Sequence, residues 1–203
     1  ATSNRKIAIT LSAAQTWQND SASPLVGVGT PSGDLSLGAY VLTVGGSGNT
    51  ILTNTIKSTT GGNGLTKTGG GKLTLAGANT YNGATLVQGG TLAVAAPSTI
   101  TNSVSVLVSP GALLDVSALS GGFTLKNVQT LGGGGSVSGT VTAPSGSKLA
   151  PGTNSVGTLT FNNDLYLTDG ATLFYDVTDV ANADKIAVGG SLSPSGTTTV
   201  SLT

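Results

Sequence analysis

The chain has 203 residues, of which eight are basic and eight acidic, and it contains neither cysteine nor histidine. Only 8% of the residues are charged, so there is no basic surface to neutralise phosphates, which argues against nucleic-acid binding. The missing cysteine excludes disulfides and thiol catalysis, and the missing histidine removes the commonest general base and transition-metal ligand.

Small and strand-favouring residues dominate the composition. The chain has 32 glycines and abundant serine and threonine, all poor helix formers, and its apolar residues are chiefly leucine, valine, alanine and isoleucine. No apolar run approaches the roughly 18 residues of a membrane-spanning helix, so we expect no membrane insertion of this segment. We therefore predict an all-β protein of many short strands joined by tight turns.

The first third of the chain alternates strand signals with glycine-rich breaks. Residues 5–11 place Ile7, Ile9 and Leu11 on one face of a strand. Residues 21–34 are rich in proline, serine and glycine and are expected to form a loop. Further strands are predicted at residues 35–37, 40–44 and 50–56.

The most regular stretch runs from Gly64 to Val94 and reads GLTKTGGGKLTLAGANTYNGATLVQGGTLAV. It holds three short alternating runs, separated by glycines and an Asn-Gly pair that suit turns with positive φ. Turn rules alone make Gly89-Gly90 the centre of an antiparallel hairpin. The alternative is a corner of a parallel solenoid, in which each strand pairs with the coils above and below it.

This stretch resembles the autotransporter-associated β-strand repeat, with the pattern GLxKxGxGxLxLxGxNTYxGxTxVxxGTLxV. The Asn79-Thr80-Tyr81-x-Gly83 segment makes the match more specific than glycine content alone. The resemblance implies a single-stranded right-handed parallel β-helix (β-solenoid) on a secreted, extracellular or outer-surface protein, and it favours the solenoid corner over the hairpin. It implies no reaction.

Strand signals continue after this block. Alternating valines lead into a Pro110-Gly111 turn, and further strands are predicted within residues 113–116 and 123–131. Gly132–Gly135 is expected to be a tight corner, because a new strand pattern follows at once. From Lys148 onward, the chain resembles the C-terminal coils of autotransporter passengers, in which an APGxSxGTLT turn precedes several strands and a DxIxVxGxLxxxG closing unit.

The spacing of related fragments predicts the size of the solenoid. At roughly twenty residues per coil the chain makes roughly ten short coils, and at about 4.8 Å per coil they give a rod of nearly 50 Å. We expect one domain over residues 1–203, with N-terminal coils and a cap in 1–60, a repeat core in 61–131 and C-terminal coils in 132–203.

Five of the eight acidic residues lie between positions 164 and 184. Clustered carboxylates suit a hard cation, which makes Asp164, Asp169 and Asp184 calcium candidates. No D-x-[DN]-x-[DN]-G loop is present, and the alternative is that these aspartates form turns. We expect no resident metal, no cofactor and no catalytic residue. An enzyme acting on polysaccharides would need a carboxylate pair, and Asp164 and Asp184 are spaced to stack on adjacent coils.

The ends of the predicted solenoid are the main candidate site, because an open β-helix exposes unpaired strand edges there. The net charge of the chain is zero at pH 7, so no overall electrostatic repulsion keeps two copies apart. We predict an assembly interface of homo-oligomers or fibres formed by end-to-end stacking. Its residues are Arg5, Lys6, Ile7, Ile9, Leu11, Thr198, Val200 and Leu202. The alternatives are a capped monomer and a fragment of a longer chain.

These features favour a non-enzymatic structural protein, either a rigid stalk or a self-assembling extracellular fibre subunit with an adhesive role. A module that binds surface glycans or ice is the alternative, and a polysaccharide-active enzyme is the third hypothesis. Aromatic residues grouped on one outer face would favour glycans. Six Thr-x-Thr pairs aligned on one face would favour ice, although their intervals share no common coil length.

Overall fold

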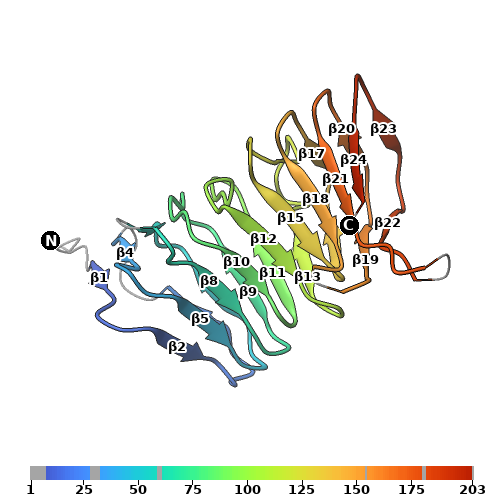
Figure 1. Cartoon of the computed structure of the whole chain (residues 1–203). Coiled ribbons are helices and arrows are strands. Elements are labelled where there is room, and N and C mark those ends of the chain that lie inside the picture. The colour runs from blue at the N-terminus through green and yellow to red at the C-terminus, as the bar shows by residue number, and fades with distance from the viewer. Residues whose placement is uncertain (1–7, 28–32, 59–60, 154, 180–181, 203) are drawn as a thin grey trace, which may run out of the picture.

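The computed structural model describes residues 8–27, 33–58, 61–153, 155–179 and 182–202. Its strands stack coil upon coil into a β-solenoid (Figure 1), and all the pairings between its named strands are parallel. The expected all-β parallel β-helix is confirmed. None of the described residues forms a helix long and apolar enough to cross a membrane.

Two long sheets form the faces of the solenoid. The nine-stranded sheet contains, in order, β2 (Gln15–Gln18), β5 (Leu42–Gly45), β8 (Leu65–Lys67), β10 (Thr85–Val87), β12 (Ser105–Val108), β15 (Thr130–Gly133), β18 (Lys148–Pro151), β21 (Thr172–Tyr175) and β24 (Thr199–Leu202). The eight-stranded sheet contains β3 (Leu25–Val26), β6 (Thr50–Leu52), β9 (Lys72–Leu75), β11 (Thr91–Val94), β13 (Leu113–Asp115), β16 (Ser136–Ser138), β19 (Thr158–Phe161) and β22 (Lys185–Val188).

Two shorter sheets complete the stack, one toward each end. The N-terminal one contains β1 (Ile9–Thr10), β4 (Leu35–Ser36) and β7 (Ile56–Lys57). The C-terminal one contains β14 (Phe123–Thr124), β17 (Val141–Ala143), β20 (Leu165–Leu167) and β23 (Leu192–Pro194). Between them the chain runs through 76–84 and 95–104 without a strand.

The pairing register corrects the predicted coil number. Gln15 lies opposite Leu42, a step of 27 residues, whereas Leu131 lies opposite Leu149, a step of 18. Nine stacked strands give eight turns rather than ten, because most coils are longer than twenty residues and hold the excess in their corners. At about 4.8 Å per step, the nine-stranded sheet is about 38 Å tall.

Three local predictions can be compared with this register. The solenoid corner favoured at Gly89-Gly90 is confirmed and the alternative hairpin is wrong, because β10 pairs with β8 and β12 while β11 pairs with β9 and β13. The expected loop over 21–34 contains the short strand β3, and residues 28–32 lie outside the described part. The tight corner expected over Gly132–Gly135 is confirmed only for Gly134 and Gly135, because Gly132 and Gly133 belong to β15 and β16 begins at Ser136.

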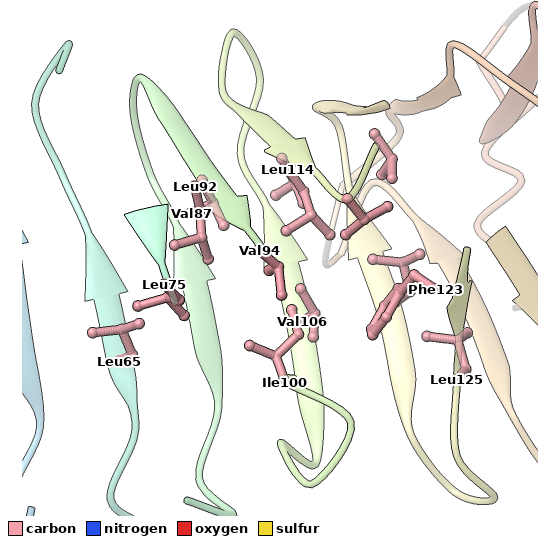
Figure 2. Close-up of a cluster of buried hydrophobic side chains, with 14 of the residues drawn as sticks. Leu65, Leu75, Val87, Leu92, Val94, Ile100, Val106, Leu114, Phe123 and Leu125 are labelled. Atoms are coloured by element: carbon pink, nitrogen blue, oxygen red, sulfur yellow. The ribbon is translucent and has the colours of Figure 1, made fainter. Parts of the chain in front are cut away.

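Inward-facing side chains form ladders along the axis. Val106, Leu131 and Leu149 lie directly over one another and are fully buried. Figure 2 shows neighbouring steps of the same core, from Leu65 to Leu125. Burying such a side chain stabilises the fold by about 2 kcal/mol, so each coil is held mainly by its contacts with the next one.

Buried polar side chains hold the corners of the repeat. Lys67 is 2% exposed, and its ammonium donates to the carbonyl oxygens of Thr68, Gly69 and Gly89 at 2.6, 2.8 and 3.1 Å. The Asn79 amide accepts from the Ile56 N–H at 2.9 Å and donates to another coil. These bonds satisfy backbone groups that leave the strand ladders at the turns.

Candidate functional site

The C-terminal end of the solenoid exposes its own core. Leu192 lies opposite the fully buried Leu165 but is 53% exposed, because no further coil covers it among the described residues. Val200 and Leu202 occupy the corresponding inward positions of β24 and are 56% and 68% exposed. We call these three residues the end face. Inward positions that are buried in the middle coils are thus open to solvent here.

The backbone of the last coil is open as well. β22, β23 and β24 are the terminal strands of three sheets (Figure 1), so one side of each strand has no neighbouring strand among the described residues. No charged residue lies between Gly189 and Leu202. Exposed edges are usually protected by charge or coverage, and this one has the form of a surface for further strand pairing.

The N-terminal end is described only in part. Arg5, Lys6 and Ile7 lie outside the described residues. Ile9 is half-buried against the core, and Leu11 is 6% exposed, so its side chain lies inside the first coils. At the C-terminal end, Thr198 is partly buried immediately before β24. Among the described members of the predicted interface, Val200 and Leu202 therefore present apolar side chains most openly.

Leu192 belongs to the same end face, although the sequence analysis did not select it. The signal was available, because Ser191-Leu192-Ser193-Pro194 follows the strand pattern of Asp164-Leu165-Tyr166-Leu167 one coil later. Only the register shows that this leucine belongs to the terminal coil.

The calcium candidates lie at separate corners of the last coils. Asp164 accepts a hydrogen bond from the Ser191 N–H, and Asp169 accepts one from the Thr197 N–H, each at 2.8 Å. Asp184 is 6% exposed. Its two carboxylate oxygens accept from backbone N–H groups of Gly157 and Asp176 at 2.8 and 2.9 Å. Within the described residues, no three acidic side chains come together to hold a metal.

The carboxylate pair considered for an enzyme does not stack. Asp164 directly precedes β20 in the C-terminal four-stranded sheet, whereas Asp184 directly precedes β22 in the eight-stranded sheet. The two residues therefore lie at different corners, and each is occupied with a backbone donor of a neighbouring coil. Their arrangement is that of structural turn residues.

Among the described residues, neither the threonine pairs nor the tyrosines gather on one face. Thr66, Thr142 and Thr160 lie on strands of three different sheets, which gives no common register for ice. Tyr81 is buried, where burial raises the pKa of its hydroxyl above the ordinary value of 10.0, and Tyr166 lies on a different sheet from Tyr175. An extended aromatic platform for glycans is therefore absent from the described faces.

Comparison with known proteins extends this picture. Residues 65–94 match the family described as Passenger-associated-transport-repeat. The chain is 37% identical over 142 residues to an extracellular serine protease of Serratia marcescens, which covers 70% of this chain and 11% of that protein. It is 35% identical over 184 residues to the adhesin BmaC autotransporter of Brucella suis biovar 1 (strain 1330), which covers 81% of this chain and 5% of that protein.

The chain thus spans about a tenth or less of the length of these two relatives. The expected resemblance to the autotransporter repeat is confirmed, and the similarities indicate secretion or a place at the outer cell surface. Since the matched residues 65–94 lie in the middle of the stack, from β8 to β11, the chain carries an autotransporter passenger-type repeat within a parallel β-helix.

Proposed function

We propose that this chain is a rigid extracellular β-solenoid segment, a stalk or fibre subunit with an adhesive role, that joins other copies end to end. The observation that carries the proposal is the end face, where Leu192, Val200 and Leu202 continue the buried ladders but are exposed. The similarity to an adhesin supports the adhesive part, and the unbroken nine-stranded sheet supports the mechanical part.

The physical basis is continuation of the stack. A coil docked on the end face would bury three large apolar side chains, each stabilising the contact by about 2 kcal/mol, and would pair the open edges of β22 to β24. The first coil of a second copy offers apolar residues of its own, since Leu25 and Val26 are 41% and 61% exposed. Joining unlike ends is a heterologous contact, which propagates into a filament.

The proposal is tested by imaging the purified chain by negative-stain microscopy across a range of concentrations, together with analytical ultracentrifugation. We expect uniform filaments, or oligomers that grow with concentration, for the unaltered chain. The double variant Val200→Lys, Leu202→Lys should remain monomeric, because it places two ammonium groups on the surface that must lose water.

The matched control is Thr199→Lys, Ser201→Lys, which adds the same charge to the same strand. These two residues alternate with the end-face positions, so their side chains point to the outside of the nine-stranded sheet. The control should assemble like the unaltered chain. Monodisperse rods of the unaltered chain at every concentration, or equal loss of assembly in both variants, would contradict end-to-end joining.

A further inference from the structure

The outer surface of the nine-stranded sheet is hollowed between β10 and β21. One hollow, of about 310 Å³, is lined by residues of β10, β12 and the corners beside them. A second hollow of about the same volume lies over β15, β18 and β21. Both include Thr153, so they meet there and form one trough along the solenoid axis. Four strand steps at about 4.8 Å make this trough about 19 Å long.

The floor of the trough follows from the pairing register. Leu86, Leu107, Gly132 and Ala150 lie in one column of outward-facing positions. The two leucines present apolar side chains. Gly132 is buried, because a Cβ atom added there would lie 3.2 Å from the Thr153 hydroxyl oxygen, so the small side chain of Ala150 is what leaves the sheet uncovered. Phe174 stands on the next strand, β21, and closes this gap at its other end. The result is a notch over Ala150, bounded by Thr153 and Phe174.

Charged groups of both signs line the same hollow as this aromatic ring. The Lys148 ammonium lies 5.4 Å from the centroid of the Phe174 ring, a cation–π distance. On the same hollow, the Asp184 carboxylate is held in place by the two backbone N–H groups described above. A hydrogen-bond donor and an acceptor thus flank one apolar surface, each positioned by the fold.

Two irregularities of the chain build the walls of the trough. Thr153 has a φ of 58°, a left-handed conformation that residues other than glycine, asparagine and aspartate rarely adopt. Strained backbone of this kind concentrates at functional positions. After β21, the chain leaves the stack and folds back through an antiparallel bridge between Val177 and Ala183 (Figure 1), which brings Asp184 to the rim.

We propose that this trough binds a neutral linear oligosaccharide. Sugar rings combine an apolar face of C–H groups with hydroxyls that both donate and accept, which matches an apolar floor flanked by Lys148 and Asp184. The lining contains Asp176 and Asp184 against the single cation Lys148, so its charge disfavours acidic polysaccharides. The site lies on the side of the solenoid and does not depend on end-to-end joining.

The test is saturation-transfer NMR of the full chain with cellotetraose, maltotetraose and xylotetraose, and with tetragalacturonate as an anionic probe. We expect at least one neutral tetrasaccharide to bind. Ala150→Phe should abolish binding by filling the notch, and Lys148→Gln should weaken it about tenfold, because hydrogen bonds to charged groups are the stronger ones. The double variant of the end face should bind as the unaltered chain does.

Matched controls distinguish the trough from the rest of the surface. Thr74→Phe adds the same ring to an outward position of the eight-stranded sheet, and Lys185→Gln removes an exposed ammonium from β22. Both should leave binding unchanged. Absence of binding to all three neutral probes, stronger binding of tetragalacturonate, or binding that survives Ala150→Phe would each overturn the assignment.

Discussion

Lys67 brings a positive charge inside the stack at a corner of the repeat. Burial lowers the pKa of its ammonium below the ordinary value of 10.5. The three carbonyl oxygens that accept from it belong to two successive coils, so one side chain ties the turn after β8 to the turn after β10. The lysine of this motif therefore acts as a cross-link between coils.

Replacing Lys67 with methionine should lower the free energy of unfolding by about 2 kcal/mol, because it leaves buried carbonyl oxygens without donors. Urea unfolding followed by circular dichroism measures the change. Lys72→Met is the matched control, since the Lys72 side chain is 46% exposed in a surface ion pair, and its effect should stay within about 0.5 kcal/mol. Equal effects of the two substitutions would show that the buried bonds add nothing.

At single positions the sequence predicts some corner residues and misses others. Lys67 follows Leu65 by two residues, so strand alternation alone assigns it to the interior, and this signal was not used. Val128 has a φ of 61° and is joined by a hydrogen bond to Gly146, whose φ is 75°. A glycine at such a corner is predictable from turn chemistry, but a β-branched residue in that conformation is not.

The corners, more than the strands, restrict which residues this fold accepts, because backbones of neighbouring coils approach closely there. A Cβ atom added at Gly83 would lie 1.8 Å from the backbone oxygen of Asn63 in the preceding coil. The Asn-Gly pair of the repeat is therefore required for close approach of two backbones. Gly70 lies in a corner of the same repeat, where an added Cβ meets nothing within 4 Å.

The substitution Gly83→Ala should destabilise the protein by more than about 3 kcal/mol, since relief of the clash needs movement of a neighbouring coil. Gly70→Ala should be neutral or stabilising by up to about 1 kcal/mol, because alanine reduces the entropy of the unfolded chain. Thermal unfolding of the two variants decides the matter. If the Gly83→Ala protein were as stable as the Gly70→Ala protein, the neighbouring coil would be able to move away from the added Cβ atom at little cost in free energy.

The strands themselves were predictable because each has a period of two. Runs such as Leu73–Leu75 and Thr85–Val87 appear as strands with bounds close to those expected. Coil length was not predictable, because it depends on how many residues a corner holds. The excursion after Tyr175 lengthens one coil. The alternation of Ile186 and Val188 indicates a strand where the chain returns to the stack, but it does not indicate which strand this one pairs with.

At the scale of the whole molecule, protection from solvent decreases toward the C-terminal end. Strands in the middle alternate buried and half-buried positions, as in β12, whereas β22 and β24 contain no buried residue. In a solenoid each coil is stabilised only by its neighbours, so a terminal coil has about half the support of a middle one.

Hydrogen exchange should show this gradient. Backbone amides of β22 and β24 are expected to exchange much faster than those of β10 and β12 when the protein is dilute, and measurement by mass spectrometry resolves the strands. If copies join end to end, exchange in β24 should slow as concentration rises. Uniform protection along the chain at low concentration would contradict a stability that depends on neighbouring coils.

The fold class was within reach of the sequence because one repeat, residues 65–94, carries the strand period, the corner glycines and the buried lysine together. The end face and the trough could not be predicted from the sequence. The trough contains residues far apart in the chain, such as Lys148 and Phe174, that come together only through the register of coils of unequal length. The end face was missed because only the register shows which coil is the terminal one.

Coils here range from 18 to 27 residues while the ladders stay in register. The stacked strands thus form a constant scaffold, whereas the corners that connect them vary in length. Corners that do not pack against the backbone of a neighbouring coil, unlike the one at Gly83, can change in length or sequence without rebuilding the interior, so surface recognition can diversify faster than the scaffold that displays it. For protein engineering, the same tolerance makes the corner between β21 and β22 a natural place to graft a foreign peptide.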